Sequence, residues 1–212
     1  MAKAPILGRA KTGLGRDIGM ARAADPAAAA LLDTIDACVE AVGADHCSLA
    51  PEGALASSAR GDEITEALRG WHVLGQRGGE LGERLAFAHA DAPDLPRVQI
   101  GMDTPQVTPA LLQAVLAGLG THDAVPAPAT DGGWWALALT RGADAGRLVA
   151  VPMSTATTGD DTVEALRAGG LSVATGPVLR DVDTVEDAAL VAEQAPWTGF
   201  ATAWRTVAQR SA

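Results

Sequence analysis

Cysteine and long apolar runs are both scarce in this chain of 212 residues. The two cysteines, Cys38 and Cys47, have no Cys-x-x-Cys or Cys-His spacing around them, so we expect reduced, partly buried thiols rather than a disulfide framework or a zinc site. The longest apolar stretches, such as Ala27–Leu32, are much shorter than the roughly 20 residues of a membrane span. The N-terminus also lacks the apolar segment of a secretory signal. These absences predict a cytoplasmic protein without a membrane span.

Positive charge is scarce as well. The chain has 16 Lys and Arg residues against 26 Asp and Glu residues, and its formal net charge of -10 excludes a general binder of nucleic acid or anionic membranes. Both lysines, Lys3 and Lys11, lie near the N-terminus, where residues 1–22 hold five basic residues against one acidic residue, Asp17. Codon usage that favours arginine accounts for the scarcity of lysine but not for its position. We therefore expect the N-terminal segment to be where this acidic protein accepts phosphate.

Short β-rich segments alternate with helical ones along the whole chain, and no repeat or linker divides it. The length and a composition of 48% hydrophobic and 20% charged residues fit one globular domain over residues 1–212. The alternation predicts an α/β sandwich with a mainly parallel mixed sheet and helices on both faces. The expected helices cover residues 25–42, 62–69, 80–89, 110–119, 162–168, 184–194 and 199–209, and the expected strands cover 47–50, 71–74, 98–101, 123–127, 134–139 and 171–174.

The first motif is the N-terminal segment that contains Lys3, Gly8, Lys11 and Thr12. Its backbone N–H groups can bind phosphate oxygens while its lysines neutralise their charge. It is not a P-loop, because the Gly-Lys-Ser/Thr ending is absent, and a solvated basic N-terminus is an equal alternative. A phosphate-binding loop in an α/β fold normally follows a strand. Either that strand is missing from the given sequence, which we favour, or Met1–Pro5 supplies it.

Two aspartate motifs are candidates for a metal site. Asp103 lies in a Gly-Met-Asp-Thr-Pro turn after the expected strand 98–101, and ligands in open α/β sheets bind beyond the carboxyl ends of strands. Asp181 and Asp183 point the same way if their segment is extended. Carboxylates of this kind suit Mg²⁺ or Mn²⁺. An Asx-turn at Asp103, and an N-cap for the next helix at Asp181 or Asp183, are the structural alternatives.

A third motif is Asp131-Gly132-Gly133-Trp134-Trp135. Two glycines after an acidic residue allow the backbone to approach a ligand, and the tryptophans supply a stacking or packing surface. A tight hairpin turn with buried aromatic rings is the alternative.

Residues 76–84 form a further glycine-rich segment, in which Gln76 and Arg84 could face a ligand or simply lie at the start of a helix. The histidines, at positions 46, 72, 89 and 122, lie in separate elements without ligand-like spacing. We expect them to be surface or core residues.

The order of these motifs resembles one known family. The segments AKAPILGRAKTGL, QRGGELGERL, GMDTP, DGGWW, Ser154-Thr155 and DVDTVED follow one another as in the bacterial glycosyltransferase-like family of the radical-SAM/selenodomain-associated transferase type. The resemblance runs from residue 1 to about 195 and implies the GT-A fold of nucleotide-diphospho-sugar transferases. The N-terminal segment is also similar to that of 2-phospho-L-lactate guanylyltransferase.

The resemblance implies roles for single residues, and each role is carried over to the matching position. The nucleotide would be bound by Lys3, Pro5, Gly8, Lys11, Thr12, Gln76 and Arg84. The metal would be held by Asp103 and Asp183, and the acceptor side would contain Asp131, Gly132, Gly133 and Trp134, the last in place of the family's usual tyrosine.

Two positions depart from the family pattern. Gly13 stands where the family has an arginine, so one cationic phosphate contact is lost unless Arg9 or Arg16 replaces it. Met153 stands where the family has tryptophan.

The expected function is transfer from a nucleoside diphosphate sugar to a small-molecule acceptor with Mg²⁺ or Mn²⁺ as cofactor. Lys11 would offset charge on the leaving group, and Asp131 would orient or deprotonate an acceptor hydroxyl. The first alternative is nucleotidyl transfer, in which a phosphorylated substrate attacks the α-phosphate of GTP or CTP. The second is a nucleotide-binding protein that has lost catalysis, as Gly13 suggests.

Overall fold

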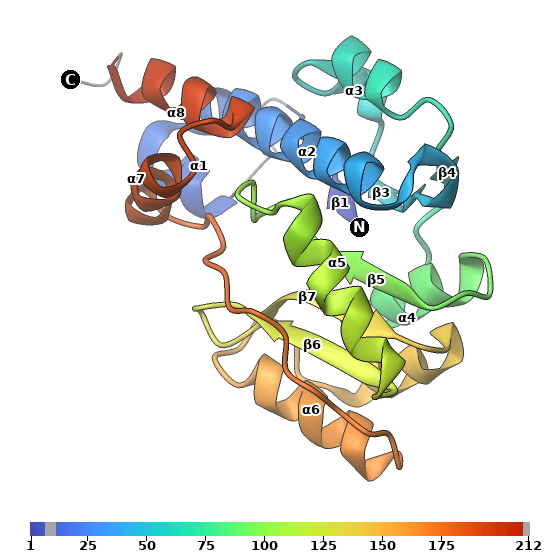
Figure 1. Ribbon diagram of the computed structural model, residues 1–212. Helices are drawn as coiled ribbons and strands as arrows, with labels where there is room; N and C mark the ends of the chain where they lie inside the picture. Colours follow the sequence, from blue (N-terminus) through green and yellow to red (C-terminus); the bar gives the residue numbers. More distant parts are fainter. Residues whose placement is uncertain (7–11, 210–212) are drawn as a thin grey trace. The chain divides into compact units, whose positions relative to one another are not determined.

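The computed structural model describes residues 1–6 and 12–209, and the chain divides into two units, each described here by itself (Figure 1). The sheet unit comprises Met1, Val73–Gly101 and Ala110–Arg180, and the helical unit comprises Ala2–His72, Met102–Pro109 and Asp181–Ala212. The α/β class is confirmed. That residues 1–212 form one domain stays a prediction.

A three-stranded sheet lies at the centre of the sheet unit, with the order β5 (Arg97–Ile100), β7 (Trp134–Leu139) and β6 (Ala124–Pro128). Both pairs are antiparallel, and β7, as the central strand, is buried from its second residue onward. Two isolated parallel bridges pair residue 173 with residue 124 of β6 and residue 179 with residue 129, directly after β6. The sheet is therefore mixed, as expected.

The expectation that the sheet is mainly parallel is wrong for these three strands. β6 and β7 are joined by the short turn 129–133, in which Gly132 has a φ of 93°. A tight turn can connect only antiparallel neighbours, whereas parallel strands need a crossover of a dozen or more residues.

Helices cover the two faces of this sheet. Figure 1 shows α5 (Pro109–Ala117) and α6 (Thr158–Ala168) on opposite sides of β6 and β7. Leu166 of α6 packs in one buried cluster with Leu137 and Leu139 of β7. These two leucines share a face because side chains alternate along a strand. The same unit contains α4 (Leu81–Asp91) and the 3₁₀ helices η3 (Gly118–Gly120) and η4 (Gly142–Ala150).

The helical unit is built around α2 (Met20–Val42) and α8 (Gly199–Gln209), which lie side by side in Figure 1. Phe200 and Trp204 of α8 pack against buried alanines of α2, so the expected apolar stripe of the last helix is confirmed. The remaining helices of this unit are α1 (Thr12–Ile18), α3 (Gly61–Ala67), α7 (Val185–Gln194), η1 (Ala44–His46) and η2 (Leu55–Ser57).

Short strands complete the helical unit. β1 (Ala2–Lys3) pairs in parallel with β3 (Pro51–Glu52), so residues 1–5 supply a strand, as one of the two alternatives stated. β2 (Ser48–Leu49) pairs with β4 (His72–Val73). No helix in the described part of the chain combines the length and apolar character needed to cross a lipid bilayer.

The start of α2 differs from the expectation. Asp25 was predicted to cap a helix whose first residue is Pro26, but α2 begins at Met20 and runs through the proline. The Asp25 carboxylate instead accepts hydrogen bonds of 2.7 and 3.0 Å from Arg60. Alanine is the best helix former, and the alanines on both sides of Pro26 are buried, so tertiary packing outweighs the hydrogen bond that proline cannot donate.

Both thiols are free, as expected, with Cys47 buried and Cys38 half-buried. Burial raises the pKa of Cys38 to about 12 and that of Cys47 to about 11. Both groups are therefore protonated at neutral pH.

Asp33 of α2 caps α8, which begins far away in the sequence. Its two carboxylate oxygens accept hydrogen bonds of 2.8 Å from the backbone N–H groups of Gly199 and Phe200. We predict that Asp33→Ala lowers the free energy of unfolding by about 1 kcal/mol, the usual cost of losing an N-cap. Asp36→Ala, at an exposed position of the same helix, is the matched control. Equal urea midpoints for the two variants would contradict the cap.

His89 of α4 makes the stability of the sheet unit depend on pH. Its side chain is buried at 2% exposure, and burial, followed by the charge of Arg97, lowers the pKa of the imidazole to about 4. The unfolded chain therefore binds the proton more readily than the folded chain between pH 6.5 and 4. Over that window we predict that stability falls as the pH falls, by up to about 1.4 kcal/mol per pH unit.

His89→Leu removes this titration and should flatten the curve of unfolding free energy against pH. His72→Leu changes an exposed histidine, and its unfolding free energy should depend on pH as that of the wild-type protein does. If the unfolding free energy of His89→Leu still falls as the pH falls, other groups cause the pH dependence.

Candidate functional site

One backbone hydrogen bond links the two aspartate motifs. The N–H of Val182 donates to the carbonyl oxygen of Asp103 at 2.8 Å, and both segments belong to the helical unit. Asp103 is half-buried in the turn that follows β5, and Asp183 is exposed directly after Val182. The structure thus places side by side two acidic segments that lie far apart in the sequence.

The cap of α7 uses neither Asp181 nor Asp183. Thr184 is the N-cap, and its hydroxyl accepts from the N–H of Asp187 at 3.1 Å while the Asp187 carboxylate accepts from the Thr184 N–H at 3.1 Å. The capping box expected in this motif is therefore present, but Thr184 and Asp187 form it and neither Asp181 nor Asp183 is the N-cap. Because Thr184 and Asp187 satisfy the helix start, Asp183 is not needed for that purpose.

The N-terminal residues predicted to bind nucleotide are only partly described. Lys3 ends β1 with an exposed side chain, and buried Pro5 accepts a hydrogen bond of 3.0 Å from the N–H of Ala59. Thr12 begins α1. Gly8, Arg9 and Lys11 lie outside the described residues.

α1 meets the second aspartate motif at Gly13. A Cβ atom built on Gly13 would lie far inside 3.0 Å of the Asp183 carbonyl oxygen and 3.4 Å from its carbonyl carbon. The start of α1 is thus packed directly on the backbone of Asp183. No local pattern in the sequence predicts this contact, because it depends on the packing of two distant segments.

The Asp131–Trp135 motif forms a hairpin turn in the sheet unit. The Asp131 carboxylate accepts from the Gly133 N–H at 2.8 Å, and the Gly132 carbonyl accepts from the Gly159 N–H at 2.8 Å. The indole N–H of Trp134 donates to the Thr162 hydroxyl at 3.2 Å. The turn interpretation is therefore confirmed, and the acceptor-side role of Asp131, Gly132, Gly133 and Trp134 stays a prediction.

Gln76 and Arg84 are brought together in the sheet unit, where the Arg84 Nη1 lies 3.5 Å from the Gln76 Oε1. Arg77, between them in the sequence, instead forms two hydrogen bonds to Asp91 and lies 3.9 Å over the ring of Phe87. A nucleotide-binding role for Gln76 and Arg84 stays a prediction.

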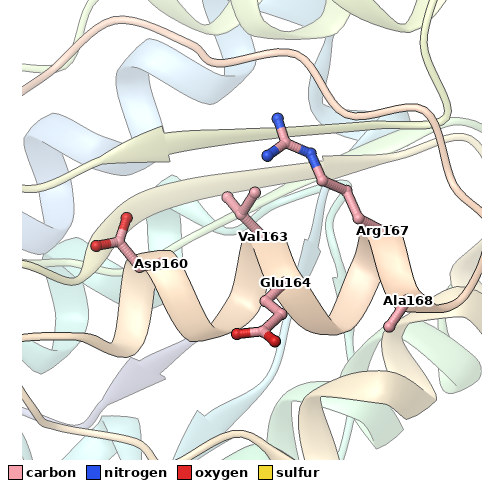
Figure 2. Close-up of a pocket in the computed structure, with 5 residues that line it drawn as sticks. All are labelled: Asp160, Val163, Glu164, Arg167 and Ala168. Atoms are coloured by element: carbon pink, nitrogen blue, oxygen red, sulfur yellow. The ribbon is translucent and has the colours of Figure 1, made fainter.

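A shallow hollow runs along α6 (Figure 2). It is lined by Asp160, Val163, Glu164, Arg167 and Ala168. These positions are spaced as one face of a single helix, and Figure 2 shows Asp160 and Arg167 extending above the helix in this view and Glu164 below it. The hollow includes none of the predicted site residues, and we assign it no function.

The donor set near Asp103 and Asp183 is small. In the described part of the chain, no group of three or more His, Cys, Asp and Glu side chains is arranged to hold a metal ion. Two carboxylates can still hold Mg²⁺ or Mn²⁺ when substrate phosphates and water supply the other oxygens, which is the usual arrangement for Mg²⁺.

A protein family matches this chain in sequence, and solved structures resemble its fold. Residues 20–155 match the family described as uncharacterized protein conserved in bacteria (DUF2064). A Desulfovibrio desulfuricans G20 protein assigned to the nucleotide-diphospho-sugar transferases is 26% identical, with a TM-score of 0.76, over 91% of this chain and 84% of its own. No curated protein matches the sequence.

More distant structures agree in fold alone. Rv0371c of Mycobacterium tuberculosis H37Rv is 19% identical, with a TM-score of 0.56, over 91% of this chain and 96% of its own. CMP:2-keto-3-deoxy-manno-octonic acid synthetase is 13% identical, with a TM-score of 0.53, over 79% of this chain and 88% of its own. The chain has the nucleotide-diphospho-sugar transferase fold and belongs to the DUF2064 family of bacterial proteins.

Proposed function

We propose that this protein is a metal-dependent transferase that uses a nucleoside diphosphate sugar as donor and a small molecule as acceptor. The observation that carries the proposal is the hydrogen bond of 2.8 Å between Val182 and Asp103, because it brings the Asp103 and Asp183 segments together. The likeness to the Desulfovibrio protein supports the class of donor.

The residues present fit a divalent cation. Asp103 and Asp183 would offer hard carboxylate oxygens to Mg²⁺ or Mn²⁺, and the diphosphate of the donor would complete the coordination. When bound, the cation neutralises negative charge on the diphosphate and favours its departure. One competing structural role for Asp183, capping of α7, is filled by Thr184 and Asp187.

Basic groups and the acceptor base have separate tasks in this proposal. Lys3, exposed at the carboxyl end of β1, would bind a phosphate, because ligands of α/β sheets lie at that end of parallel strands. Lys11 would offset charge on the leaving nucleotide. Asp131, exposed in its turn, would orient or deprotonate the acceptor hydroxyl.

Nucleotidyl transfer is the second candidate. It is supported by the fold shared with the CMP:2-keto-3-deoxy-manno-octonic acid synthetase, whose structure is complexed with CTP. In this reaction an oxygen of a phosphorylated substrate would form a bond to the α-phosphorus of a nucleoside triphosphate, and pyrophosphate would leave. The same two aspartates would serve both reactions.

We predict that Mn²⁺ together with the correct nucleotide or nucleotide sugar raises the melting temperature of the wild-type protein. A ligand at a hundredfold excess over its Kd stabilises the folded state by about 2.7 kcal/mol. Asp103→Asn and Asp183→Asn should lose the metal-dependent part of this shift. Asp160→Asn changes an exposed carboxylate outside the predicted site and should keep it.

The products separate the candidates. Release of the sugar from a UDP- or GDP-sugar supports the proposed reaction, whereas release of pyrophosphate from GTP or CTP supports nucleotidyl transfer. Metal-dependent binding without turnover would support a nucleotide-binding protein that has lost catalysis. If no nucleotide or nucleotide sugar produces a metal-dependent shift, both enzyme proposals are rejected.

A further inference from the structure

Gly13 is the point at which α1 packs on the second aspartate motif. Real Cβ atoms essentially never come within 3.0 Å of such an atom, yet a Cβ at residue 13 would be well inside that distance from the Asp183 carbonyl oxygen. The obstacle is backbone and not the end of a flexible side chain. Any side chain at position 13 would therefore displace either α1 or the Asp183 segment.

The contact at Gly13 continues directly to the first aspartate motif. Asp183 is the neighbour of Val182, whose N–H is bonded to the Asp103 carbonyl. Val182 is also buried in the same apolar cluster as Leu14, the residue after Gly13. A displacement of the Asp183 backbone relative to α1 is therefore opposed both by this bond and by the burial of the Val182 side chain.

We propose that Gly13 is a positioning residue, which sets the place of Asp183 beside Asp103 through the lack of a side chain. The inference rests on the proposed function, because it assumes that these two aspartates hold the metal ion. Binding groups must be held within about 0.5 Å of their productive geometry, and Mg²⁺ is strict about ligand placement. A Cβ at residue 13 would demand a shift of on the order of that tolerance.

Gly13 stands where the family has an arginine, and the positioning role gives this difference a new consequence. If Gly13 were merely a lost cationic contact, Gly13→Arg would add a positive charge near phosphate and tighten nucleotide binding. If Gly13 positions Asp183, the same substitution weakens metal-dependent binding, because the steric cost of the Cβ comes with every side chain. The two explanations thus predict changes of opposite sign.

The experiment compares Gly13→Ala and Gly13→Arg with Gly15→Ala in the full chain. Gly15 lies in the same short helix, and a Cβ there would meet chiefly the thioether of Met20, a flexible side chain that can move, while the nearest backbone atom, the Met20 Cα, lies 3.3 Å away. Both alanine variants gain the same helix propensity, so that effect cancels. The first readout is the affinity for Mn²⁺ in the presence of nucleotide, measured from the electron paramagnetic resonance signal of free Mn²⁺. The second readout is the affinity for nucleotide in EDTA.

We expect both Gly13 variants to bind Mn²⁺ about 10- to 100-fold more weakly, because this is the usual effect of disturbing the residues that support a metal ligand. For Gly13→Ala, the nucleotide affinity in EDTA should change little. Gly15→Ala should bind Mn²⁺ as the wild type does. Equal Mn²⁺ affinities for Gly13→Ala and Gly15→Ala, or tighter binding by Gly13→Arg, would overturn the inference.

Circular dichroism and urea unfolding are measured for each variant. If Gly13→Ala is unfolded at 25 °C while Gly15→Ala is folded, Gly13 serves the fold and the positioning role is rejected. The proposed function fails separately, when the wild-type protein itself shows no metal-dependent binding of nucleotide or nucleotide sugar.

Discussion

The backbone hydrogen bond between Val182 and Asp103 is the interaction on which the candidate site depends. It joins the turn after β5 to the segment before α7, and it uses main-chain atoms only. This link does not depend on the identity of the side chains of the two residues that form it. Buried Val182 anchors this contact in the apolar cluster of the helical unit. The segments of Asp103 and Asp183 are consequently neighbours through their backbones.

The local structure around this contact removes one competing explanation for Asp181 and Asp183, namely that they cap α7. Thr184 and Asp187 form a complete capping box at the start of α7. In the sheet unit, by contrast, the Asp131 motif is largely accounted for as a turn, because the Asp131 carboxylate accepts from Gly133. Helix capping therefore does not account for Asp183, whereas turn formation accounts for Asp131.

Local signals in the sequence predicted the α/β class, most of the helices and the strand β7. The C-terminal helix over 199–209 is confirmed, because its amphipathic pattern agrees with its burial. The start of α2 at Met20 was not predicted, since Pro26 is a strong local stop signal that buried alanines override. The antiparallel pairing of β6 with β7 was also missed, although the Asp-Gly-Gly turn had been identified.

The sequence by itself determined the α/β class, and its lysines at one end and aspartates after expected strands predict a site for phosphate and a divalent cation. It also pointed to the transferase fold through the order of its motifs. Only the tertiary structure decided which segments are neighbours, including the packing of Gly13 on the Asp183 carbonyl. The reason is physical: local preferences act within a few residues, whereas a contact between distant segments depends on how buried side chains such as Val182 pack.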